Sequence, residues 1–339
     1  MAGYGVIGVG TIGRRHIQGY AGVSGSKVEA VSDVHPGALA GAATSYQVAG
    51  SYADYNDLLA DDAIVGVSIC TPPFNHAEIT IAAAEAGKHV LVEKPMCMTA
   101  AEARSMVAAT RNAGVILGVC HARSRFRAST EAARTHVADG KLGDVYYARV
   151  ASSRRRGRPG VDILTHSRWF LDSELAGGGT LFDIGCYDID RLLYVLGSPR
   201  PVSVSAMTYR GIPHNLPADV KYDVEEHATL FVRFEGGVAA TFEKASAIND
   251  VGENTMQILG SEGGIRLDPF TYFTEEDGEQ VDLTPDLPRD TGENLFSDFV
   301  RACEQGAEPK TTGEDGVKVM QIMTSAYESA RIGGEIRIS

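Results

Sequence analysis

The sequence predicts an α/β protein in two parts, a doubly wound parallel sheet followed by an α+β domain with a mostly antiparallel open sheet. Over about the first 120 residues, short apolar runs alternate with helix-like segments, which is typical of a parallel sheet covered by helices on both faces. Beyond about residue 122, strand-like runs follow one another across short turns. We therefore expect domains at residues 1–122 and 123–339, since 339 residues is long for one core.

The first part is predicted to contain five apolar strands with helices between them. The strands are expected at YGVIGV, KVEAVS, IVGVSIC, HVLVE and VILGVC. Helices are expected from Ile12, over residues 36–46, from an Asn75 cap to Ala86, and from a Thr99/Glu102 capping box to Gly114.

The second part is predicted to be rich in strands that pair through turns. A helix at residues 129–137 precedes strands at DVYYARVASS, VSVSAMTY, HATLFVRF, GVAATFEKAS and TMQILG, and helices at 293–304 and 315–330 follow. EGG at 235–237 is typical of a hairpin turn. One face of such a sheet needs a cover, which a second subunit would supply.

Composition excludes several classes of function. The net charge of −13 disfavours nucleic acid as a partner, because an acidic surface repels phosphate backbones. No apolar run approaches the ~20 residues of a membrane helix, and the N-terminus enters a strand directly, so we expect neither a membrane segment nor a signal peptide. The five cysteines are scattered, which indicates free thiols and a cytoplasmic location.

Gly8, Gly10 and Gly13 form a G-x-G-x-x-G turn between the first strand and the first helix, as in Rossmann domains. Such a turn brings backbone N–H groups to a pyrophosphate. Asp33 ends the second strand, 20 residues after Gly13, where a ribose-binding acid belongs. A carboxylate there favours NAD and repels the 2′-phosphate of NADP, although Arg14 and Arg15 lie close in sequence. The alternative is an ordinary turn followed by a surface Asp.

Lys94 follows the apolar strand HVLVE and precedes Pro95. A lysine packed against apolar groups loses hydration, which lowers its pKa toward the working pH of a general acid/base. A lysine in a surface loop is the alternative.

Asp183, Tyr187 and Asp190 are spaced i, i+4 and i+7 after the run of glycines at 177–179. On an α-helix that spacing places them on one face. After a flexible glycine-rich entry, such a face is predicted either to project into a cleft or to lie in solvent.

These segments resemble the Gfo/Idh/MocA oxidoreductases, which include glucose–fructose oxidoreductase and inositol dehydrogenases. The resemblance extends along nearly the full chain. It rests on the order and spacing of GVGTIG, CTPPFNHAE, VEKP at 92–95, GGGTLFDIGCYDID at 177–190 and the final TTGEDGVKVMQIMTSAYESA.

The resemblance implies an assignment of site residues. Lys94 would be the main acid/base, Tyr187 a hydroxyl ligand or proton relay, and Asp183 the residue that orients the substrate. Tyr187 stands where histidine is commoner in the family, and tyrosine titrates near pH ~10, so the division between Lys94 and Tyr187 stays open. The implied cofactor residues are Gly8, Gly10, Thr11, Ile12, Gly13, Asp33, Thr71, Pro72, His76, Glu93 and Lys94. The implied substrate residues are Lys94, Arg125, Arg156, Trp169, Asp183 and Tyr187.

Several of these residues have ordinary alternatives. His76 is either near the cofactor ribose or a capped surface histidine, and Trp169 is either near the nicotinamide or in the core. Phe170 replaces an arginine common in the family. Arg156 lies in the basic run RRRGRPG, which is either a solvated loop or a pocket wall. Arg125 and Phe126 resemble the R-F pair that the family has at the domain crossover.

The predicted function is an NAD-dependent oxidoreductase that transfers hydride between a ring hydroxyl of a sugar, glycoside or related polyol and nicotinamide. An inositol dehydrogenase is the first alternative. A non-redox family member, either a dinucleotide-binding regulator or an NAD-dependent glycosidase, is the second. We expect no metal, and a homodimer or homotetramer through the C-terminal sheet.

Overall fold

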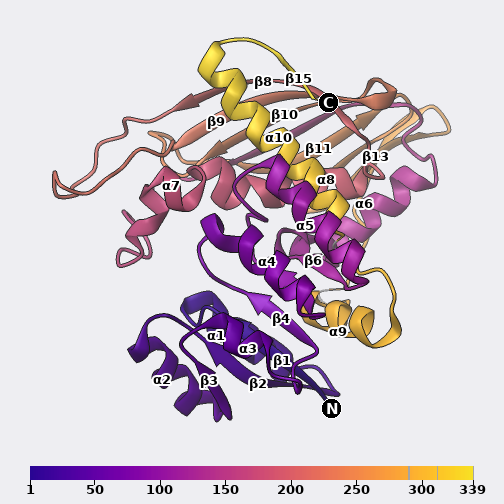
Figure 1. Ribbon diagram of the computed structural model, residues 1–339. Coiled ribbons are helices and arrows are strands. Elements are labelled where there is room, and N and C mark those ends of the chain that lie inside the picture. The colour runs from indigo at the N-terminus through magenta and orange to yellow at the C-terminus, as the bar shows by residue number, and fades with distance from the viewer. Residues whose placement is uncertain (289–290, 311, 339) are drawn as a thin grey trace. The chain divides into compact units, whose positions relative to one another are not determined.

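The computed structural model describes residues 1–288, 291–310 and 312–338 (Figure 1). The chain divides into two compact units, each with its own sheet. The first unit comprises Met1–Arg123 and Glu293–Val317, and the second comprises Ser124–Gly292 and Lys318–Ser339.

A six-stranded parallel sheet forms the centre of the first unit, which confirms the predicted fold class. The strand order β3-β2-β1-β4-β5-β6 is that of a doubly wound dinucleotide-binding domain. Its strands are β1 Ala2–Ile7, β2 Ser26–Ser32, β3 Gly50–Tyr52, β4 Gly66–Ile69, β5 His89–Val92 and β6 Leu117–Val119. Its helices are α1 Thr11–Ala21, α2 Pro36–Tyr46, α3 Tyr55–Leu59, the 3-10 turn η1 Pro73–Asn75, α4 His76–Glu85, α5 Ala100–Ala113 and α9 Leu295–Gln305.

Local signals account for some helix ends but not for all. The capping box is confirmed, because Thr99 Oγ1 accepts the Glu102 N–H and Glu102 Oε2 accepts the Thr99 N–H. Asn75 is the N-cap residue of α4, as predicted, but its side chain makes no capping hydrogen bond. Its amide oxygen accepts the Thr71 hydroxyl at 2.7 Å instead, and η1 precedes α4. Asn75 therefore stabilises the loop after β4 rather than the helix.

The helix α9 packs with the first unit, although it lies far along the chain. Phe296 stands edge-on to His16 and Tyr20 of α1, and Phe299 lies against Tyr4 of β1. The predicted domain boundary at 122/123 places all later residues in the second domain. The structure instead returns Glu293–Val317 to the first unit, because the apolar face of α9 covers aromatic rings there.

A nine-stranded open sheet forms the second unit, in the order β14-β13-β12-β11-β7-β10-β9-β8-β15. Neighbouring strands are antiparallel except β7 and β10, which confirms the mostly antiparallel prediction. The strands are β7 Val145–Ser153, β8 Pro201–Tyr209, β9 His227–Phe234, β10 Ala239–Ala245, β11 Asn254–Gly260, β12 Gly264–Leu267, β13 Phe270–Glu276, β14 Glu279–Leu283 and β15 Ile336–Arg337.

Short helices connect and cover these strands. They are α6 Ala128–Ala138, the 3-10 turn η3 Arg168–Leu171, α7 Ser173–Ala176, the π-helical turn η4 Leu181–Gly185, α8 Cys186–Val195 and the 3-10 turn η5 Glu235–Gly237. The 3-10 turn η2 Cys120–Phe126 and the helix α10 Gly313–Ile332 each begin in the first unit and end in the second. The predicted EGG hairpin turn is confirmed, with positive φ at Gly236 and Gly237.

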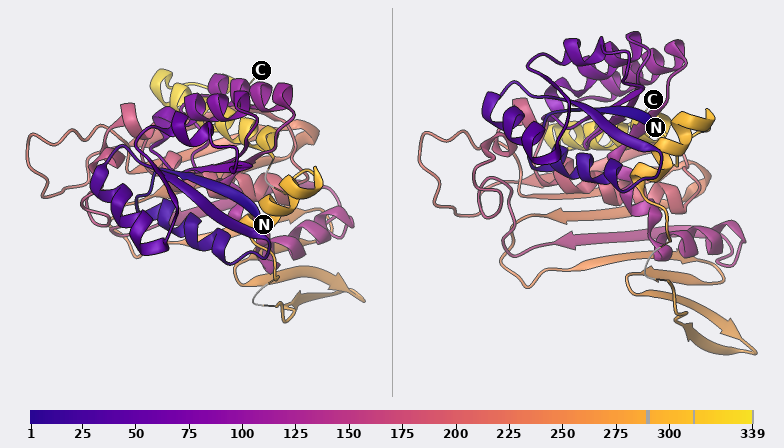
Figure 2. Two further views of the ribbon diagram at one scale, coloured as in Figure 1. Left: turned by 60° about the horizontal axis from the view of Figure 1, so that its bottom comes forward. Right: turned by 90° about the horizontal axis from the view of Figure 1, so that it is seen from below.

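The two faces of the nine-stranded sheet differ in cover. Figures 1 and 2 show α6, α7 and α8 on one side of it. Along β9, buried residues alternate with less buried ones, as expected when one face is covered. The less covered face carries Met207, Phe231 and Leu259 among polar residues.

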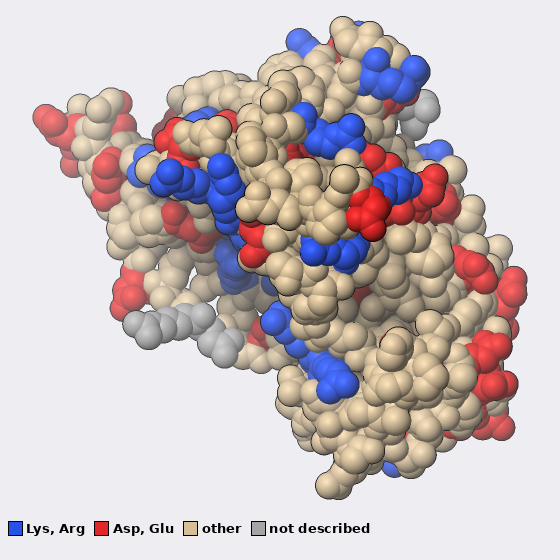
Figure 3. All heavy atoms as spheres, turned by 90° about the vertical axis from the view of Figure 1, so that its left-hand side faces the viewer, with Lys and Arg blue, Asp and Glu red and all other residues tan. Residues whose placement is uncertain are grey.

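No helix among the residues described is both long and apolar enough to cross a lipid bilayer. On the face shown in Figure 3, basic side chains occur in several separate groups and acidic ones lie among and around them.

Candidate functional site

The glycine-rich turn after β1 has the geometry of a phosphate cradle. Gly8 has φ +86°, and a Cβ there would lie 2.8 Å from the carbonyl carbon of Cys70. A Cβ on Gly13 would lie 1.9 Å from the Gly8 oxygen, so only glycine permits this contact of helix and strand. A Cβ on Gly10 would meet no atom within 4 Å. The first N–H groups of α1, at Thr11 and Ile12, have no side-chain cap. The turn thus has the space and donors that a pyrophosphate requires.

Asp33 closes this turn from the end of β2. Its Oδ2 accepts the Val9 N–H at 2.8 Å, and its Oδ1 accepts the His35 N–H at 2.8 Å. Arg14 Nε donates to the Val9 oxygen at 3.3 Å, so one guanidinium flanks the same turn. Arg15 is exposed. The carboxylate is therefore held in place at the edge where a ribose would bind.

His76 joins two loops of the first unit rather than lying at the surface. Its side chain is fully buried, with Nε2 2.8 Å from the Thr71 oxygen and Nδ1 2.9 Å from the Pro95 oxygen. Burial lowers the pKa of this imidazole, so it is neutral and donates to one of the two carbonyls. His76 thereby fixes the loop of Thr71 and Pro72 against the turn that carries Lys94.

Glu93 and Lys94 follow β5, but they face different surroundings. Lys94 is half-buried between the buried residues Glu93 and Pro95. Glu93 is 3% exposed. Its Oε2 accepts the backbone N–H of Lys94 at 2.9 Å, and its Oε1 accepts His16 Nε2 at 2.9 Å and Arg123 Nη2 at 2.5 Å. The Glu93 carboxylate therefore holds the backbone of Lys94 from inside the domain.

The charge of Glu93 is balanced inside this network. Burial alone raises the pKa of its carboxyl, but the hydrogen bond from His16 and the positive charge of Arg123 outweigh burial and hold that pKa well below its usual range. His16 Nδ1 also lies 2.8 Å from Ser68 Oγ, which is bonded to the Tyr20 hydroxyl.

Cys120 completes a cluster with His16 and Glu93 whose ligand atoms lie within 4.8 Å of one another. A metal ion would need that spacing. Here the Arg123 guanidinium already supplies the positive charge at Glu93, and burial raises the pKa of the Cys120 thiol, which opposes a thiolate ligand. Glu93 therefore forms an ion pair with Arg123, and His16 is hydrogen-bonded to the same carboxylate.

Asp183 and Tyr187 lie on consecutive turns of different helix type in the second unit. Asp183 is on the π-helical turn η4, and Tyr187 is on α8. Both side chains are half-buried. Asp190 lies on α8 three residues after Tyr187 and is fully buried, deeper than either of these two side chains.

Arg125 binds Asp190 in the interior of the second unit. The Arg125 side chain is 2% exposed, and its Nε and Nη2 donate to the two oxygens of Asp190 at 3.0 and 2.5 Å. The guanidinium also lies 4.8 Å from the centre of the Tyr194 ring. The structure thus brings Arg125 to Asp190.

The aromatic pair before the glycine run is only partly buried. Trp169 and Phe170 stack with ring centres 3.7 Å apart, and both are half-buried. Trp169 is therefore outside the core of its unit. His166 is exposed, and Arg168 donates to the Gly160 oxygen.

The basic run contains two kinds of arginine. Arg154, Arg155 and Arg156 are exposed, and Arg156 donates to backbone oxygens at 155 and 248 and to the Asn249 side chain. Arg158 is buried, and all its side-chain N–H groups are used. They donate to Asp162, Glu226, Ile212 and Pro213.

A small hollow in the second unit lies beside Asp183. Its lining includes Thr180, Asp183, Tyr222, Glu225 and Arg158. Arg158 belongs to the basic run that the sequence singled out, whereas Glu225 was missed, because an isolated acid without a motif carries no positional signal.

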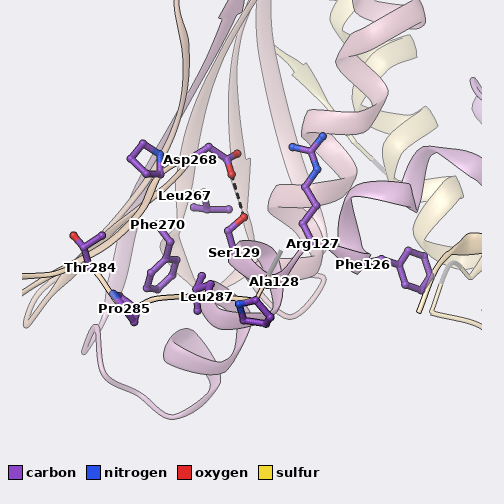
Figure 4. A pocket seen from close by; sticks show the side chains of 12 residues that line it. Phe126, Arg127, Ala128, Ser129, Leu267, Asp268, Phe270, Thr284, Pro285 and Leu287 are labelled. Atoms are coloured by element: carbon purple, nitrogen blue, oxygen red, sulfur yellow. Dashed lines mark hydrogen bonds between the residues drawn. The ribbon is translucent and has the colours of Figure 1, made fainter. Parts of the chain in front are cut away.

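A larger hollow, of about 480 Å³, lies elsewhere in the second unit (Figure 4). Its lining includes Phe126, Ser129, Asp268 and Phe270, but not Asp183 or Tyr187. Ser129 Oγ donates to Asp268 Oδ1 at 3.0 Å across one wall. None of the predicted catalytic residues lines this larger hollow.

Comparison with known proteins matches both parts of the chain. Residues 2–121 match the family model GFO_IDH_MocA, described as "Oxidoreductase family, NAD-binding Rossmann fold". Residues 130–266 match the "GFO/IDH/MocA C-terminal domain".

Relatives of known activity align over most of the chain. A 1,5-anhydro-D-fructose reductase of Ensifer adhaerens is 31% identical over 97% of this chain and 96% of its own length. A D-glucoside 3-dehydrogenase of Escherichia coli is 30% identical over 80% and 79%. Among solved structures, an aldose-aldose oxidoreductase from Caulobacter crescentus, complexed with glycerol, superposes with a TM-score of 0.81 at 27% identity, covering 99% of both chains.

Proposed function

The chain belongs to the GFO/IDH/MocA oxidoreductase family, and from that premise we propose that it transfers hydride between a ring hydroxyl of a sugar, glycoside or related polyol and NAD. The first unit is an NAD-binding Rossmann domain. The observation that carries the substrate class is the alignment, over nearly the full length of both chains, with a relative named for an anhydro-sugar. A second relative is named for a glucoside.

The residues of the first unit fit a bound dinucleotide. The open space at Gly10 and the uncapped start of α1 would take the pyrophosphate, and Asp33 would accept the ribose hydroxyls. The Thr71–Pro72 loop, fixed by His76, and the turn at Glu93 and Lys94 would line the remaining cofactor site. When bound, NAD accepts the hydride of the reacting carbon or returns it.

Lys94 is the proposed acid/base. Its half-buried side chain directly follows β5 and Glu93, and an amine at that place can exchange a proton with a hydroxyl group. In the oxidative direction the Lys94 amine takes the proton of the substrate hydroxyl. Tyr187 is the proposed ligand of that hydroxyl, and Asp183 orients the substrate through a neighbouring hydroxyl. Both project from half-buried positions on η4 and α8.

The test follows NADH absorbance while the purified protein is incubated with NAD and each member of a panel of sugars, glycosides, anhydro-sugars and inositols. The reverse direction is followed as loss of NADH absorbance with the keto form of each compound. Turnover with a sugar or glycoside supports the proposal. Turnover with inositols alone would indicate an inositol dehydrogenase instead. Binding of NAD by calorimetry without turnover in either direction would contradict it and indicate a regulator. Aglycone release without net NADH would indicate a glycosidase.

We also propose a homodimer or homotetramer through the less covered face of the nine-stranded sheet. Met207 on β8 is 49% exposed and Leu259 on β11 is 36% exposed. A second subunit can bury apolar side chains that are exposed on an uncovered sheet face. Met207→Glu should lower the mass measured by light scattering, whereas Tyr146→Glu, at an exposed position on the opposite face of β7, should not.

A cytoplasmic location is the last part of the proposal. All five cysteines carry free thiols, and four of them are buried. Such a set is typical of a reducing compartment. Alkylation of the denatured protein straight from lysed cells should modify five thiols without prior reduction.

A further inference from the structure

Glu225 holds the turn that leads to Asp183. This residue is 8% exposed and lies just before β9. Its Oε2 accepts the Gly179 N–H at 2.8 Å, its Oε1 accepts the Leu181 N–H at 2.9 Å, and its backbone oxygen accepts the Thr180 N–H at 3.2 Å. One residue thus binds three successive backbone amides at the start of the π-helical turn η4.

Tyr327 of α10 completes this arrangement. Its hydroxyl donates to Glu225 Oε2 at 2.8 Å, while its ring packs on Phe182 with centres 5.4 Å apart. We call Glu225 and Tyr327 together the Glu225 clamp. Both belong to the second unit, as do the amides that the clamp holds.

The clamp explains the run of glycines. A Cβ on Gly179 would lie 1.9 Å from the Glu225 oxygen, and a Cβ on Gly178 would lie 2.1 Å from the Tyr327 hydroxyl. Gly177 has φ +80°, which L side chains rarely adopt. The sequence predicts a flexible entry here, and the structure corrects it. The glycines allow the chain to approach the clamp closely, and the resulting turn is held by buried hydrogen bonds.

We propose that Glu225 and Tyr327 are positioning residues, which set where Asp183 stands toward the polyol. This inference rests on the proposed function. The Asp183 N–H donates to the Gly179 oxygen at 2.9 Å, so Asp183 is bonded to a residue that the clamp holds directly. Asp183, Thr180 and Glu225 also line one hollow. A displacement of about 1 Å in such a group can lower turnover by about 10²-fold.

The clamp needs an ionised carboxylate, because both Glu225 oxygens accept hydrogen bonds. A protonated carboxyl would need an acceptor for its own hydrogen, so either the Tyr327 hydroxyl would reverse its hydrogen bond or an N–H group would lose its acceptor. Burial raises the pKa of Glu225, and the bonds from Leu181, Gly179 and Tyr327 lower it only in part. The other titratable groups that line this hollow are Asp183 on η4, Tyr222 and Arg158, and Glu226 accepts hydrogen bonds from the last two.

The pH dependence therefore has a definite sign. The ionised clamp is present above the pKa of Glu225 and is lost as pH falls through it. Substrate KM should then rise on the acid side while NAD binding in the first unit stays constant. Loss of the Tyr327 hydroxyl removes a donor that favours the ionised form, so it should move this acid limb to higher pH.

The experiment compares three variants of the full chain. Tyr327→Phe removes only the hydroxyl and keeps the ring, and Glu225→Gln keeps the shape without the charge. Tyr272→Phe is the matched control, because that hydroxyl donates to the Lys141 oxygen at another edge of the unit. The readouts are kcat and KM for the polyol identified with the wild type, the pH profile of kcat/KM, the Kd for NAD, and the thermal midpoint.

The inference predicts a 10- to 100-fold loss of kcat/KM in Tyr327→Phe and Glu225→Gln, on the usual scale for misplaced groups. It also predicts an acid limb at higher pH in Tyr327→Phe, an unchanged Kd for NAD, and no effect of Tyr272→Phe. If Glu225→Gln does not fold, Tyr327→Phe alone decides.

Wild-type turnover with unchanged kinetics and an unchanged acid limb in Tyr327→Phe would overturn the clamp's role. Equal losses of NAD binding and catalysis would overturn it too, since they indicate general destabilisation. A wild type inactive on every polyol would instead remove the proposed function, and the clamp's role with it.

Discussion

Asp33 Oδ2 accepts the backbone N–H of Val9 at 2.8 Å, which joins the end of β2 to the glycine-rich turn after β1. The same carboxylate accepts the N–H of His35 through Oδ1. Its position is therefore fixed by the protein before any ligand binds. A charge fixed there can discriminate between a ribose hydroxyl and a phosphate.

Asp33→Ser should weaken the preference for NAD over NADP by about tenfold or more, equivalent to about 1.4 kcal/mol. The change removes the repulsion of a 2′-phosphate, and Arg14, which donates to the Val9 oxygen, becomes the dominant nearby charge. Calorimetric Kd values for both dinucleotides give the ratio. Any loosening of the turn affects both equally, so the ratio isolates the charge.

Asp54→Ser is the matched control, because Asp54 caps α3 in the same unit through the Asn56 N–H. In Asp54→Ser the ratio of the Kd values for NAD and NADP should equal the wild-type ratio. An unchanged ratio in Asp33→Ser would show that Asp33 is not the ribose ligand.

Lys94→Ala should lower kcat for the polyol by about 10²–10⁴-fold, the usual contribution of a general acid/base. NAD should still bind, since the phosphate cradle and Asp33 are untouched. Stopped-flow absorbance and calorimetry give the two quantities. Lys27→Ala, at an exposed lysine on β2, should leave both unchanged. Near-normal turnover of Lys94→Ala would refute the acid/base assignment.

Glu93→Gln should lower the free energy of unfolding by about 1–3 kcal/mol at pH 7, because it removes the charge that accepts hydrogen bonds from His16 and Arg123. His16 and Arg123 hold the pKa of Glu93 far below that of an unfolded glutamate, which is about 4.3. The stabilisation is therefore complete above about pH 4.3 and is lost as pH falls further, toward the folded pKa.

Urea midpoints of wild type and Glu93→Gln at several pH values measure this difference. It should shrink below about pH 4.3. Glu78→Gln, at an exposed glutamate of α4 that accepts the Tyr55 hydroxyl, should show little difference at any pH. A difference between wild type and Glu93→Gln that stays constant down to pH 3 would contradict the ion-pair account.

His76→Gln should flatten the dependence of stability on pH between about 7 and 5. Burial lowers the pKa of His76, so the unfolded chain takes up a proton near pH ~6.5 that the folded chain does not. Stability of the wild type therefore falls as pH drops through that range, and the variant lacks this term. It should also be less stable at pH 8, because a flexible amide replaces the buried ring held between the Thr71 and Pro95 oxygens.

Urea midpoints at pH 8, 7, 6 and 5 provide the test. The control is His214→Gln, an exposed histidine of the second unit, which should keep the slope of the wild type. A variant slope equal to the wild-type slope would show that His76 is not the titrating group.

The local sequence was sufficient for elements whose signals are short in range. Apolar runs of strand length predicted the parallel strands, and Thr99 with Glu102 predicted a capping box that the structure contains. The glycine-rich turn was also predictable, because close backbone contacts such as that between Gly13 and Gly8 tolerate only glycine. Lys94, Asp183 and Tyr187 were proposed from motifs whose residues stand close together in sequence, and their roles stay predictions.

Spacing within one segment did not predict how deeply each side chain lies. Asp190 is fully buried against Arg125, whereas Asp183 and Tyr187 are half-buried. Periodicity gives the order of side chains around a helix, but burial depends on what the fold packs against that helix.

The sequence by itself determined the fold class, the dinucleotide turn and the identity of the family, because these depend on local patterns and on motif order. Only the tertiary structure decided which residues support them. His16 meets Glu93 across 77 positions of the chain, and Glu225 meets Gly179 across 46. Such pairs form because a buried carboxylate must find donors wherever the fold brings them, and no short-range pattern records where that is.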